Sequence, residues 1–141
     1  MTSRDTTTGA VLEQMVLPAL RRGGYDPQSQ VRIGQRFGGG RHIVDVVARH
    51  SSGRASLVSL KWQQVSGTAE QKVPFEAISL ADAILSDPDH YTKAYLVLGG
   101  QGWKLRDFYI GGGLNQHLRH GDLVTILSLE DFVARANKGL L

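Results

Sequence analysis

The sequence predicts an α/β fold in which a mixed central sheet carries helices on both faces. The hydrophobic periodicity predicts a helix, three strands, and then helix, strand, helix, strand and helix in turn. Short turn-forming stretches separate the first three strands, so these are expected to pair as an antiparallel meander. A helix joins the third strand to the fourth, and such a crossover places those strands parallel. One domain is expected over residues 9–141, after a polar, flexible tail at residues 1–8.

The first helix is expected over residues 9–22, where apolar residues recur at helical spacing. Gly23 and Gly24 follow it, and glycine accepts the left-handed conformation that ends many helices. Pro18 lies inside this stretch and has no backbone N–H, so it is expected to end or kink the helix.

Three strands are expected next, because β-branched and apolar residues dominate residues 30–36, 43–48 and 56–62. Three consecutive glycines at 38–40 supply the first turn, and Ser-Ser-Gly at 51–53 supplies the second.

The second long helix is expected to begin at Thr68, which with Gln71 fits a capping box, and to end near residues 86–88. Pro74 lies early in this helix and suggests a bend or a restart. The apolar run at 94–98 is expected to be a buried strand.

The remaining residues are expected to form further helical pieces around one more strand. Residues 103–119 are expected to be helical in two pieces separated by the glycines at 111–113. A buried strand is expected at 123–127, and Ser128 is expected to cap a last helix that runs to Asn137.

Composition excludes several classes of function. The chain has 141 residues and no cysteine, which excludes thiol catalysis, cysteine-ligated zinc and iron–sulfur chemistry. No apolar run approaches the roughly 20 residues needed to cross a bilayer, and the N-terminus does not resemble a signal peptide. We therefore expect an intracellular protein with no membrane partner.

The positive charge is concentrated in the first half of the chain. The net charge is +3, yet residues 1–61 alone hold nine Lys/Arg and four Asp/Glu. A basic surface of this kind suits a nucleic acid, although a solvated basic face is the simpler alternative.

Two charged residues lie within or at the end of apolar strands. Asp45 interrupts the strand Ile-Val-Asp-Val-Val, and Lys61 ends the following strand. A charge in such a position costs several kcal/mol unless it is paired, hydrated or bound to a metal. Neighbouring strands would place the two side by side, as metal-assisted phosphodiester hydrolysis requires: the carboxylate holds a divalent cation and the ammonium stabilises developing charge.

Polar residues follow a definite order on successive elements: Gly9-x3-Glu13 on the first helix, Asp45 on the second strand, Ser59-x-Lys61 on the third, and Gln63 just beyond. This order resembles the PD-(D/E)xK nuclease superfamily, the fold of restriction endonucleases, Holliday-junction resolvases and some homing endonucleases. The resemblance covers residue 9 to about residue 98. It implies a restriction-endonuclease-like αβββαβ core.

The resemblance also implies roles for the residues that carry it. Glu13 and Asp45 would bind Mg²⁺, with Mn²⁺ as a substitute, and Lys61 would be the catalytic lysine. Gln63 would support the site; Gln64 competes for this role, but strand alternation from Lys61 favours Gln63.

The sequence departs from the family pattern at two positions. Val44 replaces the proline of the motif, which only shapes the entry to the strand. Ser59 stands where the second acid is expected, and a serine is a poor Mg²⁺ ligand. Some restriction endonucleases with the same S-x-K pattern recover the carboxylate from the next helix, which by spacing is Glu76 here. Glu70 is the alternative; if neither reaches the site, Glu13 must serve as the second ligand.

The first hairpin is a candidate DNA contact. Arg36 and Arg41 flank the triglycine turn and His42 follows, so these three residues are expected to reach phosphates or enter a groove. A plain flexible turn is the alternative.

These observations lead us to expect a Mg²⁺-dependent DNA endonuclease of the restriction, homing or phage type. One small domain holds one active site, so a homodimer or a higher symmetric homo-oligomer is expected. The alternatives are a Holliday-junction resolvase and a non-catalytic DNA-binding protein on a nuclease-like scaffold, the latter because of Ser59.

Overall fold

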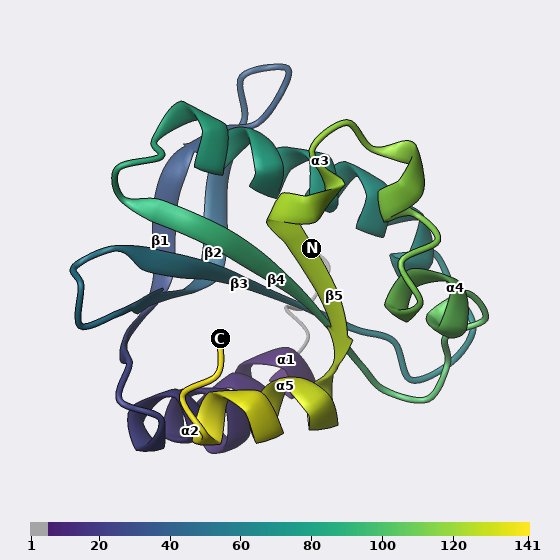
Figure 1. Cartoon of the computed structure of the whole chain (residues 1–141). Coiled ribbons are helices and arrows are strands. Elements are labelled where there is room, and N and C mark those ends of the chain that lie inside the picture. The colour runs from purple at the N-terminus through teal and green to yellow at the C-terminus, as the bar shows by residue number, and fades with distance from the viewer. Residues whose placement is uncertain (1–5) are drawn as a thin grey trace.

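The computed structural model describes residues 6–141 and contains the expected mixed sheet (Figure 1). Its strands follow the order of the sequence: β1 (Asp26–Gln35), β2 (Arg41–Arg49), β3 (Ala55–Trp62), β4 (Tyr91–Gly99) and β5 (Val124–Ser128). The first three strands are antiparallel, and β3, β4 and β5 are parallel. The predicted α/β class and strand directions are confirmed.

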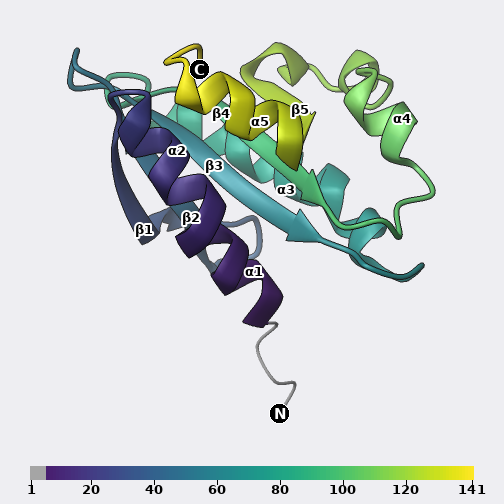
Figure 2. The ribbon, with the colours of Figure 1, turned by 90° about the horizontal axis from the view of Figure 1, so that it is seen from below.

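Helices cover both faces of the sheet (Figures 1 and 2). One face carries α1 (Thr6–Val11), α2 (Leu17–Arg22) and α5 (Leu129–Asn137). The other carries α3 (Ala69–Ser86) and α4 (Arg106–Ile110). Within residues 6–141, none of the helices combines the length and the apolar character needed to cross a bilayer.

The central strands bury both of their faces. Along β3, Leu57 packs in the core beneath α3, whereas Val58 packs in the core beneath α2 and α5. Strands covered on both sides become almost continuously apolar. Any polar side chain on β3 therefore lies in a low-dielectric setting unless it is near the end of the strand.

The N-terminal helical segment continues past Pro18 instead of ending there. Residues Leu12–Val16 form a π-helical segment between α1 and α2, in which the Leu17 N–H bonds to the Leu12 carbonyl. Pro18 lies in the first turn of α2, where its missing N–H is tolerated. Of the predicted tail, residues 1–5 lie outside the described residues, and Thr6 already begins α1.

The long helix α3 also passes through its proline without a break. Pro74 has no N–H to bond to the carbonyl of Glu70, and the Tyr109 hydroxyl donates to that carbonyl instead, at 2.6 Å. Thr68 precedes the helix but makes no side-chain cap bond. At α5 the predicted cap is present, because the Ser128 hydroxyl accepts a hydrogen bond from the Asp131 N–H.

Candidate active site

The candidate site lies where β2 separates from β3. The two strands pair only from Val46 opposite Val58 to Arg49 opposite Ala55, so the second half of β3 has no partner on the β2 side. Asp45 is the first residue beyond this pairing, and its Oδ2 accepts a hydrogen bond from the Leu60 N–H at 2.7 Å. The Asp45 side chain thus replaces the missing strand partner, because a backbone donor left without one is costly.

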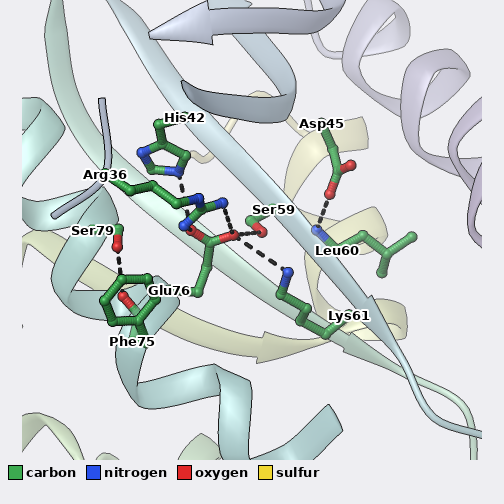
Figure 3. Close-up of polar contacts among 9 residues, drawn as sticks. All are labelled: Arg36, His42, Asp45, Ser59, Leu60, Lys61, Phe75, Glu76 and Ser79. Carbon is green, nitrogen blue, oxygen red and sulfur yellow. Dashed lines mark hydrogen bonds and ion pairs between the residues drawn. The ribbon is translucent and has the colours of Figure 1, made fainter. Parts of the chain in front are cut away.

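Helix α3 brings a second carboxylate to the same stretch of β3 (Figure 3). Glu76 Oε1 accepts from Arg36 Nη1 at 2.9 Å and lies 3.0 Å from His42 Nε2. Glu76 Oε2 accepts from the Ser59 hydroxyl at 3.1 Å and lies 3.4 Å from Lys61 Nζ. An ionised carboxylate only accepts hydrogen bonds, so His42 Nε2 carries the hydrogen in this contact.

The partners of Glu76 differ in freedom. His42 and Ser59 are buried, whereas the side chains of Arg36 and Lys61 are each 26% exposed. The two buried partners therefore hold Glu76 in place, and the two partly exposed cations have more room to move.

The surroundings of Glu76 favour its ionised form. Burial by itself would raise its pKa, but the hydrogen bonds from His42 and Arg36 and the charge of Lys61 outweigh burial. They hold the pKa of Glu76 well below its usual range. Glu76 is therefore a carboxylate at neutral pH.

Asp45 is in the opposite situation. Burial raises its pKa, and the negative charge of Glu76 raises it further. The Leu60 N–H, the charge of Lys61 and a hydrogen bond from Gln30 act in the other direction without cancelling the rise. Neighbouring carboxyl groups whose pKa values are shifted in opposite directions are frequent in functional sites.

A small cavity opens onto these groups. It has a volume of about 180 Å³ and is lined by Arg36, Lys61, Lys72, Phe75 and Glu76. Three cations and one carboxylate on the wall of one cavity suit a bound anion, with Glu76 available to a cation that accompanies it.

The donor set is compatible with a hard divalent cation. Within residues 6–141, no group of three or more acidic or histidine side chains gathers that could hold a metal ion alone. Mg²⁺ is nevertheless commonly bound by one or two carboxylates, with water and substrate phosphate completing its shell. Asp45 and Glu76 provide such a pair, and the like-charge interaction that raises the pKa of Asp45 is one that a cation would relieve.

Comparison with known proteins identifies the family of the chain. A family model described as the PD-(D/E)XK nuclease superfamily domain matches residues 4–140. The chain belongs to the PD-(D/E)XK nuclease superfamily. The fold described above, a mixed five-stranded sheet between helices, is consistent with the restriction-endonuclease-like fold.

Solved structures resemble the chain more distantly, and no curated protein matches its sequence. The chain is similar to a protein of unknown function called AF1548, with 14% identity, a TM-score of 0.48 and 80% of this chain covered. It is also similar to EndoMS in a complex with double-stranded DNA, with 17% identity, a TM-score of 0.42 and 86% of this chain covered. The chain spans 54% and 42% of those two proteins.

Glu13, Glu70 and Glu76 were the candidates to replace the acid missing at Ser59. Among them, the structure brings only Glu76 to the PD-(D/E)XK strand. The Glu70 carboxylate instead accepts from the backbone N–H groups of Lys104 and Leu105, the latter at 3.0 Å. Glu13 is exposed on the π-helical segment, which covers the opposite face of the sheet from α3. Within the described chain, no hydrogen bond or ion pair links Glu13 to Asp45, Glu76 or Lys61.

Gln63 lies beyond the end of β3 and faces the loop after β4. Its N–H bonds to the Gly99 carbonyl, and its side-chain Nε2 donates to the Gly102 carbonyl at 2.7 Å. A Cβ at Gly100 would collide with the Gln63 backbone, so this glycine allows the two segments to approach. Gln63 thus joins two loops, and its side-chain amide bonds to the Gly102 carbonyl and not to Lys61.

The three hairpin residues have different environments. Arg41 is exposed on the surface. His42 is only 1% exposed and contacts Glu76, so its ring is not available at the surface for a phosphate. Arg36 lies between the two, with both of its terminal nitrogens on Glu76.

Sequence reasoning did not find that Arg36 and His42 anchor Glu76, or that Gln30 assists Asp45. One signal for His42 was available: it precedes Val44 by two positions, so alternation places it on the buried side of β2. Gln30 gave no such signal. Its backbone has a positive φ of 56°, which interrupts the regular strand geometry of β1, and its residue type does not predict this conformation.

Proposed function

We propose that this chain is a Mg²⁺-dependent DNA endonuclease in which Glu76 supplies the acid that the PD-(D/E)XK strand lacks. The contact of Glu76 with both Ser59 and Lys61 is the observation that carries this proposal. It puts a carboxylate from α3 at the position on β3 where Ser59 leaves an acid missing.

Asp45 and Glu76 are the residues that would hold the metal ion. A bound divalent cation supplies positive charge to the phosphate oxygens and lowers the pKa of a water ligand. Mn²⁺ accepts the same oxygen ligands and is the expected substitute.

The side chains of this chain contribute the remaining steps. Lys61, which lines the cavity, would orient the attacking water and stabilise the negative charge that develops on the phosphate. Arg36 would contact a phosphate oxygen if a cation were bound at Glu76, and Lys72 adds a third positive charge at the same cavity. His42 and Ser59 stay in contact with Glu76 and keep it aimed at the site.

DNA is the proposed substrate because three cations, Arg36, Lys61 and Lys72, line the cavity beside Glu76. Arg41 on the exposed hairpin is a further candidate for a phosphate contact. One active site cuts one strand at a time, so we infer that a homodimer or larger symmetric assembly acts on duplex DNA. At low protein concentration, where the copies would separate, nicked plasmid should appear before linear plasmid. At high concentration, linear plasmid should appear without this delay if the assembly cuts both strands.

The test is incubation of supercoiled plasmid with the protein in Mg²⁺, Mn²⁺ or EDTA. Wild type and a Glu130→Ala control, which removes an exposed acid on α5, should nick in both metals and not in EDTA. Asp45→Ala should not nick. Cleavage that persists in EDTA or in Asp45→Ala contradicts the proposal.

The same preparations separate this function from its two alternatives. A Holliday-junction resolvase would cut a four-way junction far faster than linear duplex of the same sequence. A non-catalytic DNA-binding protein would retain salt-sensitive binding and cut none of these DNAs in any metal.

A further inference from the structure

A second cavity lies along α3 beside the candidate site. It has a volume of about 300 Å³, and its wall on the helix is formed by Ala77, Ile78, Ala81 and Leu85. Phe37 lines it from the tip of the β1–β2 hairpin, which projects beside α3 in Figure 1. The cavity is therefore mostly apolar and has an aromatic ring on one side.

An aromatic pair lies between this cavity and the smaller one that Glu76 and Lys61 line. Phe75 lines the smaller cavity and Phe37 lines the larger, and their ring centroids are 6.4 Å apart in an edge contact. Glu76 and Ala77, consecutive residues of α3, line the smaller and the larger cavity respectively. A ligand with a phosphate in the smaller cavity therefore has the larger one directly beside it.

Large apolar side chains around the two cavities are exposed to solvent. Phe37 is 53% exposed and Phe75 is 47% exposed, and both Ile78 and Leu85 are also exposed. Contiguous exposed apolar side chains of this size generally mark a binding surface.

The polar side chains around the larger cavity favour a nucleic acid over a second apolar surface. Arg119, His117 and His120 also line the larger cavity, and Arg36 and Lys72 line the smaller one. Cations on both sides of an aromatic and apolar pocket are the combination that binds single-stranded nucleic acid, since the cations follow the backbone and the ring stacks on a base. Asp82 is half-buried at this cavity and supplies an acceptor for a base amino group.

We propose that the larger cavity binds an unpaired base of the DNA strand whose phosphate lies at Glu76 and Lys61. A paired base is stacked within its duplex and cannot enter such a pocket without being extruded, at a cost of a few kcal/mol. The preferred substrate is then DNA with an unpaired nucleotide at the cleavage position. This inference rests on the proposed nuclease function and names the substrate class of the same site.

The test measures binding without cleavage. Fluorescence anisotropy in EDTA would compare a labelled duplex that has one central unpaired nucleotide with its fully paired counterpart. The variants are Phe37→Ala, which removes the ring, and Ala81→Leu, which partly fills the cavity. Phe108→Ala is the matched control, because Phe108 is exposed to a similar extent, 45%, and does not line this cavity.

Wild type and Phe108→Ala should bind the unpaired DNA about tenfold more tightly than the paired DNA, which is the size of one base-stacking contact. Phe37→Ala and Ala81→Leu should lose that preference. Equal affinity of wild type for the two DNAs overturns the inference, and so does a preference that both variants retain. Sedimentation of Phe37→Ala gives one more outcome. If the variant keeps the preference for unpaired DNA but changes from dimer to monomer, the inference is overturned and the surface is assigned to a second copy.

The outcomes also separate this inference from the proposed function. A preference for unpaired DNA in EDTA without cleavage in Mg²⁺ supports the base pocket and overturns the nuclease. Equal binding and equal cleavage of both DNAs in Mg²⁺ supports the nuclease and overturns the base pocket.

Discussion

The carboxylate of Glu76 accepts hydrogen bonds from His42, Ser59 and Arg36 and forms an ion pair with Lys61. Four partners occupy the acceptor positions that an ionised carboxylate has. Such a group is stable only as an anion, and a cation that binds it must displace a partner. In the proposed site, Arg36 and Lys61 are the partners that would leave, and both would then be able to bind a substrate phosphate.

Glu76→Gln is expected to lower the free energy of unfolding by about 2–3 kcal/mol at pH 7, because a donor amide replaces an acceptor that faces four donors. The pKa of Glu76 is lower in the folded protein than its ordinary value of 4.5. Its contribution is therefore complete above that value and is lost as pH falls toward the folded pKa. Urea unfolding at several pH values should show the difference from wild type shrinking below about pH 4.5. A difference that stays constant down to pH 3 contradicts this account.

Asp45→Asn is expected to stabilise the metal-free protein. Burial and the charge of Glu76 raise the pKa of Asp45 in the folded protein above its ordinary value of 3.8. Ionised Asp45 therefore lowers the free energy of unfolding at pH values above the folded pKa, and this penalty disappears below pH 3.8. Asparagine keeps an oxygen that accepts from Leu60. Urea unfolding in EDTA at pH 7.5 should show a gain of about 0.5–2 kcal/mol, the usual size of a stabilising change. A lower free energy of unfolding for Asp45→Asn than for wild type at that pH would contradict this account, because it would mean that the ionised Asp45 stabilises the metal-free protein.

Individual site residues were predictable to different degrees. Asp45 and Lys61 stood out because charges interrupt or end apolar strands, and Ser59 stood out as the wrong residue type for a ligand. The choice between Glu70 and Glu76 depended on the rotation of α3, which spacing alone does not fix. His42 was assigned to the DNA surface from its position beside a basic turn, although its partner lies 34 positions away in the chain.

At the scale of elements, α3 uses its two inward-facing glutamates for different purposes. Glu76 faces the site on β3, whereas Glu70, closer to the start of the helix, fixes the segment that leads into α4. The Tyr109 hydroxyl strengthens the same junction by bonding to the Glu70 carbonyl. The two glutamates therefore form a natural pair of test and control positions.

Glu70→Ala is expected to loosen this junction and leave catalysis intact. The variant leaves the N–H groups of Lys104 and Leu105 without an acceptor, at a cost of about 1–3 kcal/mol. Limited trypsin digestion should cut faster after Lys104 and Arg106, while plasmid nicking stays within about twofold of wild type. Loss of nicking together with retained trypsin resistance would contradict this assignment.

The order of elements was predictable because each has a distinct periodicity and turn residues separate them. The two prolines were harder to interpret, since each expected break is absorbed by a partner elsewhere. A π-helical segment accommodates Pro18, and Tyr109, 35 positions away, satisfies the carbonyl that Pro74 leaves free. The 103–119 stretch forms only the short helices α4 and Asn115–His117, because glycines at 111–113 interrupt it.

At the scale of the whole molecule, the sheet places every component of the site at one end. Asp45 and Lys61 lie where β2 separates from β3, α3 adds Glu76, and the hairpin between β1 and β2 brings Arg36. These residues span 41 positions in the chain, from Arg36 to Glu76. The two cavities lie side by side at this end, so the cations of the smaller cavity and the proposed base pocket are neighbours.

The central claim is that Glu76 supplies the acid missing at Ser59, and moving the acid back tests it most directly. The measurement is the rate of supercoiled plasmid nicking in Mg²⁺ by Glu76→Ala and by the double variant Ser59→Glu/Glu76→Ala, with melting curves to verify folding. Since Ser59 contacts Glu76 at 3.1 Å, a glutamate at 59 reaches the space that Glu76 leaves. We expect the single variant to lose at least about 100-fold in rate and the double variant to recover at least about tenfold. Nicking by folded Glu76→Ala at the wild-type rate would contradict the account.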